Sequence, residues 1–366
     1  MIRKCHIASL ILVTAVTLWA QVGPRQHSLE DLLALARDRS PAILAAQQRV
    51  EALRGARTSA VTPAGPEVEF SKGTGKSLDG TVSRGEHGWA VSQSIEWPGR
   101  WHARVKAADQ MLAAGRAESM ATKADVLASV QEQYFGILFS QKEAALLESQ
   151  ATAAEDLLSL AEKRVQVGEG RELDRIKARV EALRTERKLE AARSEVCVRK
   201  TVLNQFLLGA LGEDYELLGG FELPRDIAAR EGTLRRLLDA SPALQEARAR
   251  AVAAEWTLKA EQQGRFPDLT AAYLDTNELD RRARTFSLAL RIPLWGFNSG
   301  PIRTAKAESA AALLEETRLK AEVASKGERA YQEYALAFAQ AKSYETDLLP
   351  SAEKSLKIAT FSYGQG

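Results

Sequence analysis

An internal duplication constrains the fold of this chain more than any other feature of its sequence. Matching segments recur at an offset of 201 residues near the start of each copy, and the offset falls to 197 and then 196 farther along. The matches are Ser40-Pro41-Ala42 with Ser241-Pro242-Ala243, Pro66 with Pro267, Ile95 and Gly99 with Ile292 and Gly296, and Val167-Gly168-Glu169-Gly170 with Tyr363-Gly364-Gln365-Gly366. One supersecondary unit of roughly 200 residues is therefore used twice, as residues 21–218 and 219–366.

Residues 1–20 have the pattern of a secretory signal peptide. Arg3 and Lys4 precede an apolar run from Ile7 to Ala20, and about 14 apolar residues are too few to span a bilayer as a helix. We expect cleavage after Ala20. Removal of two positive charges lowers the formal net charge from +2 to 0, so no polyelectrolyte partner is indicated and nucleic-acid binding is not expected.

The composition favours long helices over a thick globular core, because 45% of residues are apolar and 27% charged but only 6% are aromatic. Cys197 is the one cysteine after the predicted signal peptide. A disulfide within the mature chain is therefore excluded, and stability must come from packing or assembly.

A period of two residues predicts one β-hairpin in each copy, at residues 66–97 and 268–294. In the first hairpin, strands 66–71 and 89–97 flank a polar loop at 72–88. The second hairpin has strands 268–273 and 286–294. Large apolar side chains fall on one face of the better strands, and small or polar side chains fall on the other.

Two readings of these hairpins are open, a soluble sheet and a transmembrane barrel. The better strands are about nine residues long, which is enough to cross a bilayer when tilted. Aromatic residues bracket each apolar face, as in the girdles of membrane barrels. These girdle residues are Trp89, Trp97, Phe286 and Trp295. We favour the barrel, and because four strands cannot close one, two, three or four copies would have to assemble into eight, twelve or sixteen strands.

Long helices fill the rest of each copy. The expected helices are 28–60 with a restart at Pro41, 100–167 and 171–208 in the first copy, and 233–264 and 301–363 in the second. At about 1.5 Å per residue, helix 100–167 extends about 100 Å and equals helices 28–60 and 171–208 laid end to end. We therefore expect a sheath of paired helices with the break at 168–170 at its far tip. The second copy has no return helix before Gly366, so it reads as truncated.

Two apolar stripes predict how the long helices pack. The first consists of Val126, Val130, Tyr134 and Ile137. The second consists of Leu173, Ile176, Val180 and Leu183, whose alternating spacings of three and four are typical of a coiled-coil seam.

No catalytic or metal-binding constellation is indicated. The run Gly73–Ser77 lacks the first glycine of a phosphate loop, because Phe70 stands at that position. The four histidines are scattered, and Cys197 lies in an apolar stretch typical of packing. We therefore expect no enzymatic activity, no cofactor and no metal site.

Several segments resemble the outer-membrane efflux protein family, the TolC-like channels of tripartite efflux systems. They are Ser28-Leu29-Glu30-Asp31-Leu32-Leu33-Ala34-Leu35-Ala36 with Ser40-Pro41-Ala42, Ser92-Gln93-Ser94-Ile95-Glu96-Trp97-Pro98-Gly99-Arg100, Ile292-Pro293-Leu294-Trp295-Gly296-Phe297-Asn298-Ser299-Gly300, and Leu349-Pro350-Ser351-Ala352 leading to Phe361-Ser362-Tyr363-Gly364. These segments span nearly the whole mature chain in the family's order. The strand-exit segments most resemble the heavy-metal cation efflux branch.

The resemblance implies a mainly α fold with a transmembrane β-hairpin per repeat. It implies a homotrimer whose four strands per chain form a twelve-stranded outer-membrane barrel above a periplasmic coiled-coil tunnel. It also implies that the turn between the paired helices contacts a periplasmic adaptor protein. The residues that match this adaptor-contact tip are Arg164, Val167, Gly168, Glu169, Gly170 and Asp174, with Gly364 and Gly366 in the second copy. An ordinary helix-helix turn is the alternative for this segment.

The function implied is a passive export duct in the outer membrane for small molecules or metal cations, driven by an inner-membrane pump through the adaptor. The alternative is a soluble periplasmic coiled-coil adaptor or scaffold. Adaptors usually carry one helical hairpin within β-rich domains, whereas this chain has two helical copies, each with one strand hairpin. The sequence therefore favours the duct.

Overall fold

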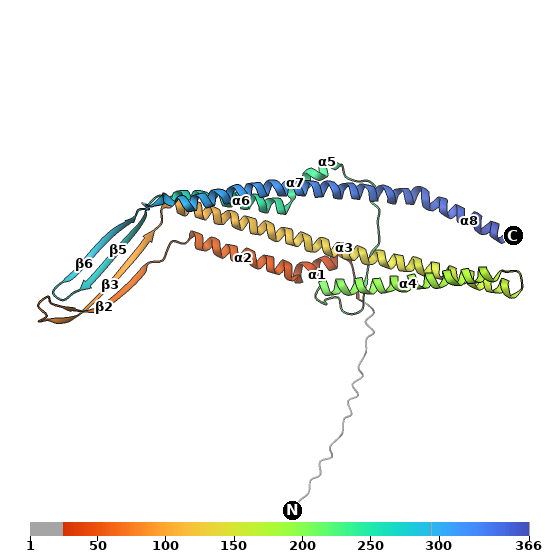
Figure 1. Ribbon diagram of the computed structural model, residues 1–366, viewed down its shortest axis with the longest axis horizontal. Coiled ribbons are helices and arrows are strands. Elements are labelled where there is room, and N and C mark those ends of the chain that lie inside the picture. The colour runs from red at the N-terminus through yellow and green to blue at the C-terminus, as the bar shows by residue number, and fades with distance from the viewer. Residues whose placement is uncertain (1–24, 294, 366) are drawn as a thin grey trace, which may run out of the picture. The chain divides into compact units, whose positions relative to one another are not determined.

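The computed structural model describes residues 25–293 and 295–365 (Figure 1). The predicted signal peptide, Leu294 and Gly366 lie outside the described residues. The chain divides into two compact units, Met1–Leu35 with Val130–Gly220 and Ala36–Ser129 with Phe221–Gly366. The long helix α3 (Pro98–Gln166) contributes residues to both units.

Both copies begin with a helix that breaks at a Ser-Pro step. Helix α1 (Leu29–Arg39) is followed by α2 (Pro41–Val61), and α5 (Arg230–Ala240) by α6 (Pro242–Gln263). The intervening serines have nearly the same extended conformation, with φ −63° and ψ 120° at Ser40 and φ −60° and ψ 115° at Ser241. The restart at Pro41 is confirmed. One unbroken helix over 233–264 is wrong, because proline disfavours helical geometry at the residue before it and suits the first position of a helix.

In the first unit, the second half of α3 runs beside α4 (Glu172–Phe206), as Figure 1 shows. Val130 and Ile137 are fully buried and Tyr134 is nearly so. This confirms that the first predicted stripe is a packing face. On α4, small residues such as Ala182 and Thr185 are buried, and small side chains let two helix backbones approach closely.

The second predicted stripe is not a packing face within the chain. Leu173, Ile176, Val180 and Leu183 are each about half exposed, at 55%, 49%, 52% and 52%. At about 100° per residue they lie on the side of α4 roughly opposite Ala182. The coiled-coil spacing is present, but α4 packs inside the chain through Ala182, Thr185, Leu189 and Leu203. It leaves the stripe from Leu173 to Leu183 uncovered.

Two short parallel strands in the first unit were not predicted from the sequence. Strand β1 (Arg25–His27) pairs with β4 (Tyr215–Leu217). Tyr215 is buried, which raises its pKa to about 12, and its hydroxyl donates to the Lys200 carbonyl at 2.8 Å. In return the Lys200 ammonium donates to the Tyr215 carbonyl at 2.7 Å. Strands of three residues are too short for an alternating pattern to reveal them.

In the second unit, two hairpins form one antiparallel sheet in the order β2-β3-β5-β6 (Figure 1). The strands are β2 (Glu67–Lys76), β3 (Ser83–Ile95), β5 (Asp268–Asn277) and β6 (Arg282–Arg291). The duplicated hairpins therefore lie side by side, joined through β3 and β5. Within the described chain β2 and β6 each pair on one side only.

The predicted long loop at 72–88 is wrong, because the strands continue into it. Lys72 pairs with His87 and Lys76 with Ser83, so the turn spans only 77–82. There the Ser77 amide donates to the Val82 carbonyl at 2.9 Å. Polar composition suggested a loop, but ladder hydrogen bonds join backbone groups and need no apolar side chains.

The long helix expected at 301–363 is interrupted. Helix α7 (Ser299–Ser343) passes through a π-helical turn, η2 (Tyr344–Leu348), into α8 (Leu349–Gln365). The Leu349 amide bonds to the Tyr344 carbonyl, five residues back. Pro350 follows directly, and because proline has no N–H and crowds the carbonyl four residues earlier, the widened turn accommodates it.

Candidate functional site

The four-stranded sheet has one face that is largely apolar. Its register places Val68, Val91, Tyr273 and Phe286 opposite one another in one row across the strands, and Ile95, Leu269 and Leu290 in another. Phe286, Leu288 and Leu290 are 68%, 61% and 60% exposed. We call this the apolar face. A contiguous exposed surface of large apolar side chains marks contact with a membrane or another protein.

The opposite face of the sheet, the polar face, carries small and polar side chains. One row consists of Glu67, Ser92, Ala272 and Ser287. A hollow of about 220 Å³ lies on this face, lined by Glu67, Glu69, Ala90, Ser92, Ala272 and Leu274. The small side chains leave space above the backbone, which suits a surface that faces water.

The four predicted girdle residues have different surroundings. Trp89 lies on the apolar face, with its ring 5.4 Å from that of Tyr273, and Phe286 is exposed on the same face. Trp97 follows the end of β3 and stacks on Phe266 at 4.9 Å. Trp295 is 93% exposed. The girdle remains a prediction, and Trp97 also has a structural role.

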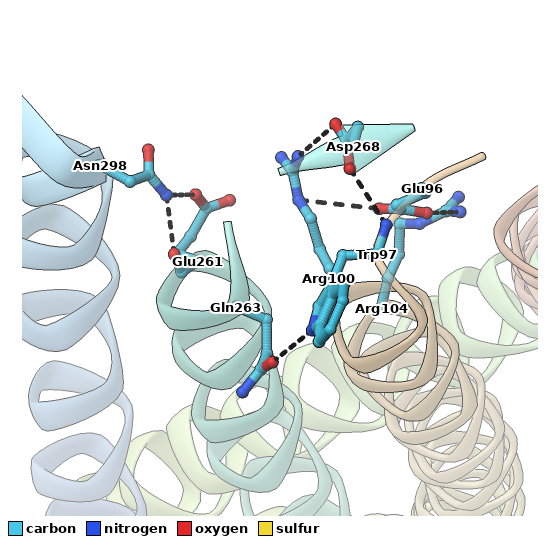
Figure 2. Close-up of polar contacts among 8 residues, drawn as sticks. All are labelled: Glu96, Trp97, Arg100, Arg104, Glu261, Gln263, Asp268 and Asn298. Carbon is cyan, nitrogen blue, oxygen red and sulfur yellow. Dashed lines mark hydrogen bonds and ion pairs between the residues drawn. The ribbon is translucent and has the colours of Figure 1, made fainter. Parts of the chain in front are cut away.

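The exit from β3 into α3 holds a network of charged residues (Figure 2). The Arg104 guanidinium lies 2.6 Å from one oxygen of Glu96, and the Arg100 guanidinium lies 3.6 Å from the other. Asp268, at the start of β5, accepts from the Trp97 amide at 3.0 Å. The indole of Trp97 donates to Gln263 of α6 at 3.0 Å. Residues of the second copy therefore hold the strand exit of the first copy.

The strand exit of the second copy is a tight left-handed turn. Gly296, Phe297 and Asn298, which form the short helix η1 (Gly296–Asn298), all have positive φ. The Asn298 amide group donates to the Glu261 carbonyl at 2.7 Å and to its carboxylate at 2.9 Å (Figure 2). Asparagine tolerates the left-handed region better than most residues, so Asn298 both turns the chain and ties α7 to α6.

A pocket of about 800 Å³ opens beside the charged network. Its lining comes from the α2–β2 connection, the end of β3, the start of α3 and the start of β5, and includes Val61, Pro63, Ile95, Trp101, Arg104 and Asp268. The Trp101 indole donates to the Val61 carbonyl at 3.0 Å. The pocket is therefore part of the sheet-helix junction.

The turn between α3 and α4 brings together five of the predicted tip residues. Gly168 has φ +81°, its amide donates to the Val165 carbonyl at 3.1 Å, and the Glu169 amide donates to the Arg164 carbonyl at 2.9 Å. This pair of bonds is the Schellman motif, which requires a left-handed residue, usually glycine, after the helix. Val167 is 69% exposed. A Cβ on Gly170 would lie 3.0 Å from the Val165 amide nitrogen, a tight contact that favours glycine at this position.

The other predicted tip residues lie elsewhere. Asp174 is in the first turn of α4, where it accepts from the Arg171 guanidinium at 3.0 Å. Gly364 lies within α8, which continues to Gln365, so the expected turn at Gly364 is wrong for the described chain. A glycine permits a left-handed turn but does not impose one. Gly366 lies outside the described residues.

In the part of the chain that the structure describes, no group of three His, Cys, Asp or Glu side chains could hold a metal ion. No described helix is both long enough and apolar enough to span a bilayer.

Comparison with known proteins agrees with this geometry. A family model described as "Outer membrane efflux protein" matches residues 32–207. These residues belong to the outer membrane efflux protein family. Among curated relatives, the cobalt-zinc-cadmium resistance protein CzcC of Cupriavidus metallidurans is 25% identical over 353 residues, covering 94% of this chain and 82% of the relative.

Solved structures of outer-membrane proteins share the fold. VceC from Vibrio cholerae superposes with a TM-score of 0.74 at 21% identity, covering 92% of this chain and 86% of that one. The open MtrE outer membrane channel of Neisseria gonorrhoeae gives 0.71 at 18% identity, covering 92% and 80%. This outer-membrane efflux fold is mainly helical with a small β-sheet, as the sequence predicted.

Sequence reasoning missed the charged network at the strand exit. Glu96, Arg100 and Arg104 are spaced by four residues across the start of α3, a spacing that brings side chains together on a helix. This spacing could have revealed the ion pairs within the first copy. The part played by Asp268 could not be seen, because it depends on how two distant hairpins pair.

Proposed function

We propose that this chain is the channel subunit of a tripartite efflux system, with its sheet in the outer membrane and its helices in the periplasm. The observation that carries this proposal is the amphipathic sheet with two open edges. A lipid-facing strand cannot leave its backbone groups unpaired, so copies must join β6 of one to β2 of the next. Three copies would close a twelve-stranded barrel with the polar face lining a wet lumen.

The uncovered stripe of α4 supports assembly of the helices as well. Leu173, Ile176, Val180 and Leu183 retain the spacing that packs against another helix, and they are half exposed in the single chain. In the proposed trimer a neighbouring helix covers this stripe. The turn around Val167 and Gly168 is the proposed adaptor contact, because its exposed valine offers a small apolar knob at a helix-hairpin end.

The duct is passive, with the work supplied by an inner-membrane pump through the adaptor. The cargo class is small molecules or metal cations, and the name of the CzcC relative, a cobalt-zinc-cadmium resistance protein, favours cations. A soluble periplasmic adaptor or scaffold is the other candidate. It fits poorly, because it gives no role to an exposed apolar sheet face.

Fractionation tests the proposal. Membranes from cells expressing the chain are washed with alkaline carbonate and with high salt, and purified protein is then examined for stoichiometry and for conductance in planar bilayers. We expect the chain to resist both washes and to form conducting trimers. Release by carbonate, or a stable monomer without conductance, would contradict the channel and favour the adaptor.

A further inference from the structure

Most of the Lys and Arg residues in the strand ends near the hairpin turns lie on one face of the sheet. The register places Lys72, His87 and Arg282 in one row and Trp89, Asp275 and Arg284 in the next, all on the apolar face. Lys76, opposite Ser83, lies on the same face. Near the turns the polar face carries Glu86 and Arg84, whereas Glu67 and Glu69 lie on it at the opposite end of β2. Cations therefore gather on the apolar face at the turn end, although the chain as a whole is nearly neutral.

Asp275 is the one carboxylate that the sheet register places among these cations. It is only 8% exposed, and the guanidinium groups of Arg282 and Arg284 lie 3.0 Å and 3.4 Å from it. These arginine side chains are themselves 62% and 65% exposed. The single charge of Asp275 neutralises only one of the two arginines, so the three side chains together keep a net positive charge. The ion pairs also hold both guanidinium groups close to the sheet.

The cations begin where the apolar band ends. Along β6 the apolar face carries Leu290, Leu288 and Phe286, and then Arg284 and Arg282. The adjoining rings of Trp89 and Tyr273 lie at this border, in the position that aromatic residues take at a membrane interface. If the band lies in hydrocarbon, the cations lie at the level of the lipid headgroups.

The nearby turns contain carboxylates, but two of them have partners in their own turns. Asp79 accepts from the Thr81 hydroxyl at 2.8 Å, and Glu278 pairs with Arg281 at 2.9 Å. Asp280 is the third carboxylate in these turns. Lys72 and Lys76, by contrast, are exposed and form no ion pair with a described residue.

We propose that Lys72, Lys76, Arg282 and Arg284, here called the basic belt, bind the phosphate groups of anionic lipids in the leaflet beside the hairpin turns. This inference rests on the proposed membrane channel and adds a lipid class to it. Phosphate oxygens match both the arginine forks and the lysine ammonium groups. Zwitterionic headgroups such as phosphatidylcholine also carry a phosphate, but their own ammonium group cancels its charge, so they attract the belt less strongly.

The test compares two pairs of substitutions in the purified full-length protein in detergent. Lys72→Gln with Lys76→Gln removes two cations from the belt without stranding Asp275. Arg84→Gln with Arg291→Gln is the control that removes the same charge from the polar face, with Arg84 near the turns and Arg291 at the end of β6 beside the helices. Native mass spectrometry measures binding of diphosphoryl lipid A and of phosphatidylcholine, and carbonate washing of membranes is measured separately.

We expect the lysine variant to bind diphosphoryl lipid A about tenfold more weakly than the unsubstituted protein, with no change toward phosphatidylcholine. The control variant should bind like the unsubstituted protein. Equal losses of lipid A affinity in both variants, or no loss in the lysine variant, would contradict the proposal that the basic belt binds lipid phosphates. Carbonate resistance is scored independently. A protein that stays in membranes but lacks this lipid selectivity would contradict only the basic belt. A protein released by carbonate would contradict the proposed channel as well.

Discussion

At the scale of single residues, Gly168 holds a conformation that other residues resist. We expect Gly168→Ala to weaken the turn by about 1 kcal/mol, because an L-residue in the left-handed region brings its Cβ close to the following carbonyl. The amides of Glu169 and Gly170, which both donate to the Arg164 carbonyl, report on this turn. Their hydrogen exchange should quicken by about fivefold.

Gly55 provides the control for this prediction. It lies within α2, where an added Cβ would meet open space. Gly55→Ala should slow local exchange or leave it unchanged, because alanine favours a helix interior over glycine. If Gly168→Ala behaves like Gly55→Ala, the left-handed requirement at the turn is refuted.

Glu96 is the shared partner of two arginines at the strand exit. Its side chain is 26% exposed, and Glu96→Gln removes the charge that holds both guanidinium groups. We expect a loss of about 1 kcal/mol, seen as faster amide exchange at Trp97 and Arg100. Glu255→Gln, which breaks an exposed pair with Lys259, should change stability by less than about 0.5 kcal/mol. Equal effects would remove any special role for Glu96.

Residue patterns predicted some of these features and missed others for a physical reason. Gly168 was predictable because a glycine after an amphipathic helix is a local signal. The link from Asp268 to Trp97 joins residues far apart in the sequence, and no local periodicity encodes such a contact. Local features of this chain can therefore be predicted from its sequence, whereas contacts between the two copies cannot.

At the scale of elements, substitutions in the uncovered stripe of α4 should affect assembly without affecting folding. Ile176→Ser with Val180→Ser should leave the helical content unchanged, because both side chains are half exposed in the single chain. The double variant should lose the trimer, because polar residues in a coiled-coil seam remove apolar burial between helices. Circular dichroism and cross-linking followed by gel electrophoresis measure the two effects.

Glu186→Ser is the control for this pair, since Glu186 lies on α4 outside the stripe. It should assemble normally. A double variant that still forms trimers would show that the stripe faces solvent in the assembly, and one that loses helix would show that it packs within the chain.

The elements themselves were predicted unevenly. The hairpins and long helices were placed from periodicity, but the ends of the strands were not. The polar residues at 72–76 and 83–88 pair through their backbones in the structure, and backbone pairing leaves no mark in side-chain pattern. The prediction of one helix over 301–363 passed over Pro350, and the sequence could not distinguish the widened turn before this proline from a kink.

At the scale of the whole molecule, the exposed turn is the proposed contact with another protein. Val167→Glu should leave the turn intact, because the Schellman bonds involve backbone groups, and should abolish efflux by placing a charge in an apolar contact. Site-specific cross-linking to the adaptor from residue 171 measures the contact directly. Glu155→Gln, at an exposed position of α3 away from the turn, should cross-link normally. Unchanged cross-linking in the valine variant would contradict the contact.

The two open edges of the sheet also bear on inheritance. In a closed ring every copy supplies both a β2 edge and a β6 edge, so a copy with one damaged edge blocks its neighbours too. If half of the copies in a cell were damaged, random mixing into the proposed trimers would leave about one ring in eight built wholly of sound copies. In the proposed ring, damage to an edge strand is therefore expected to be dominant, whereas loss of the whole chain is expected to be recessive.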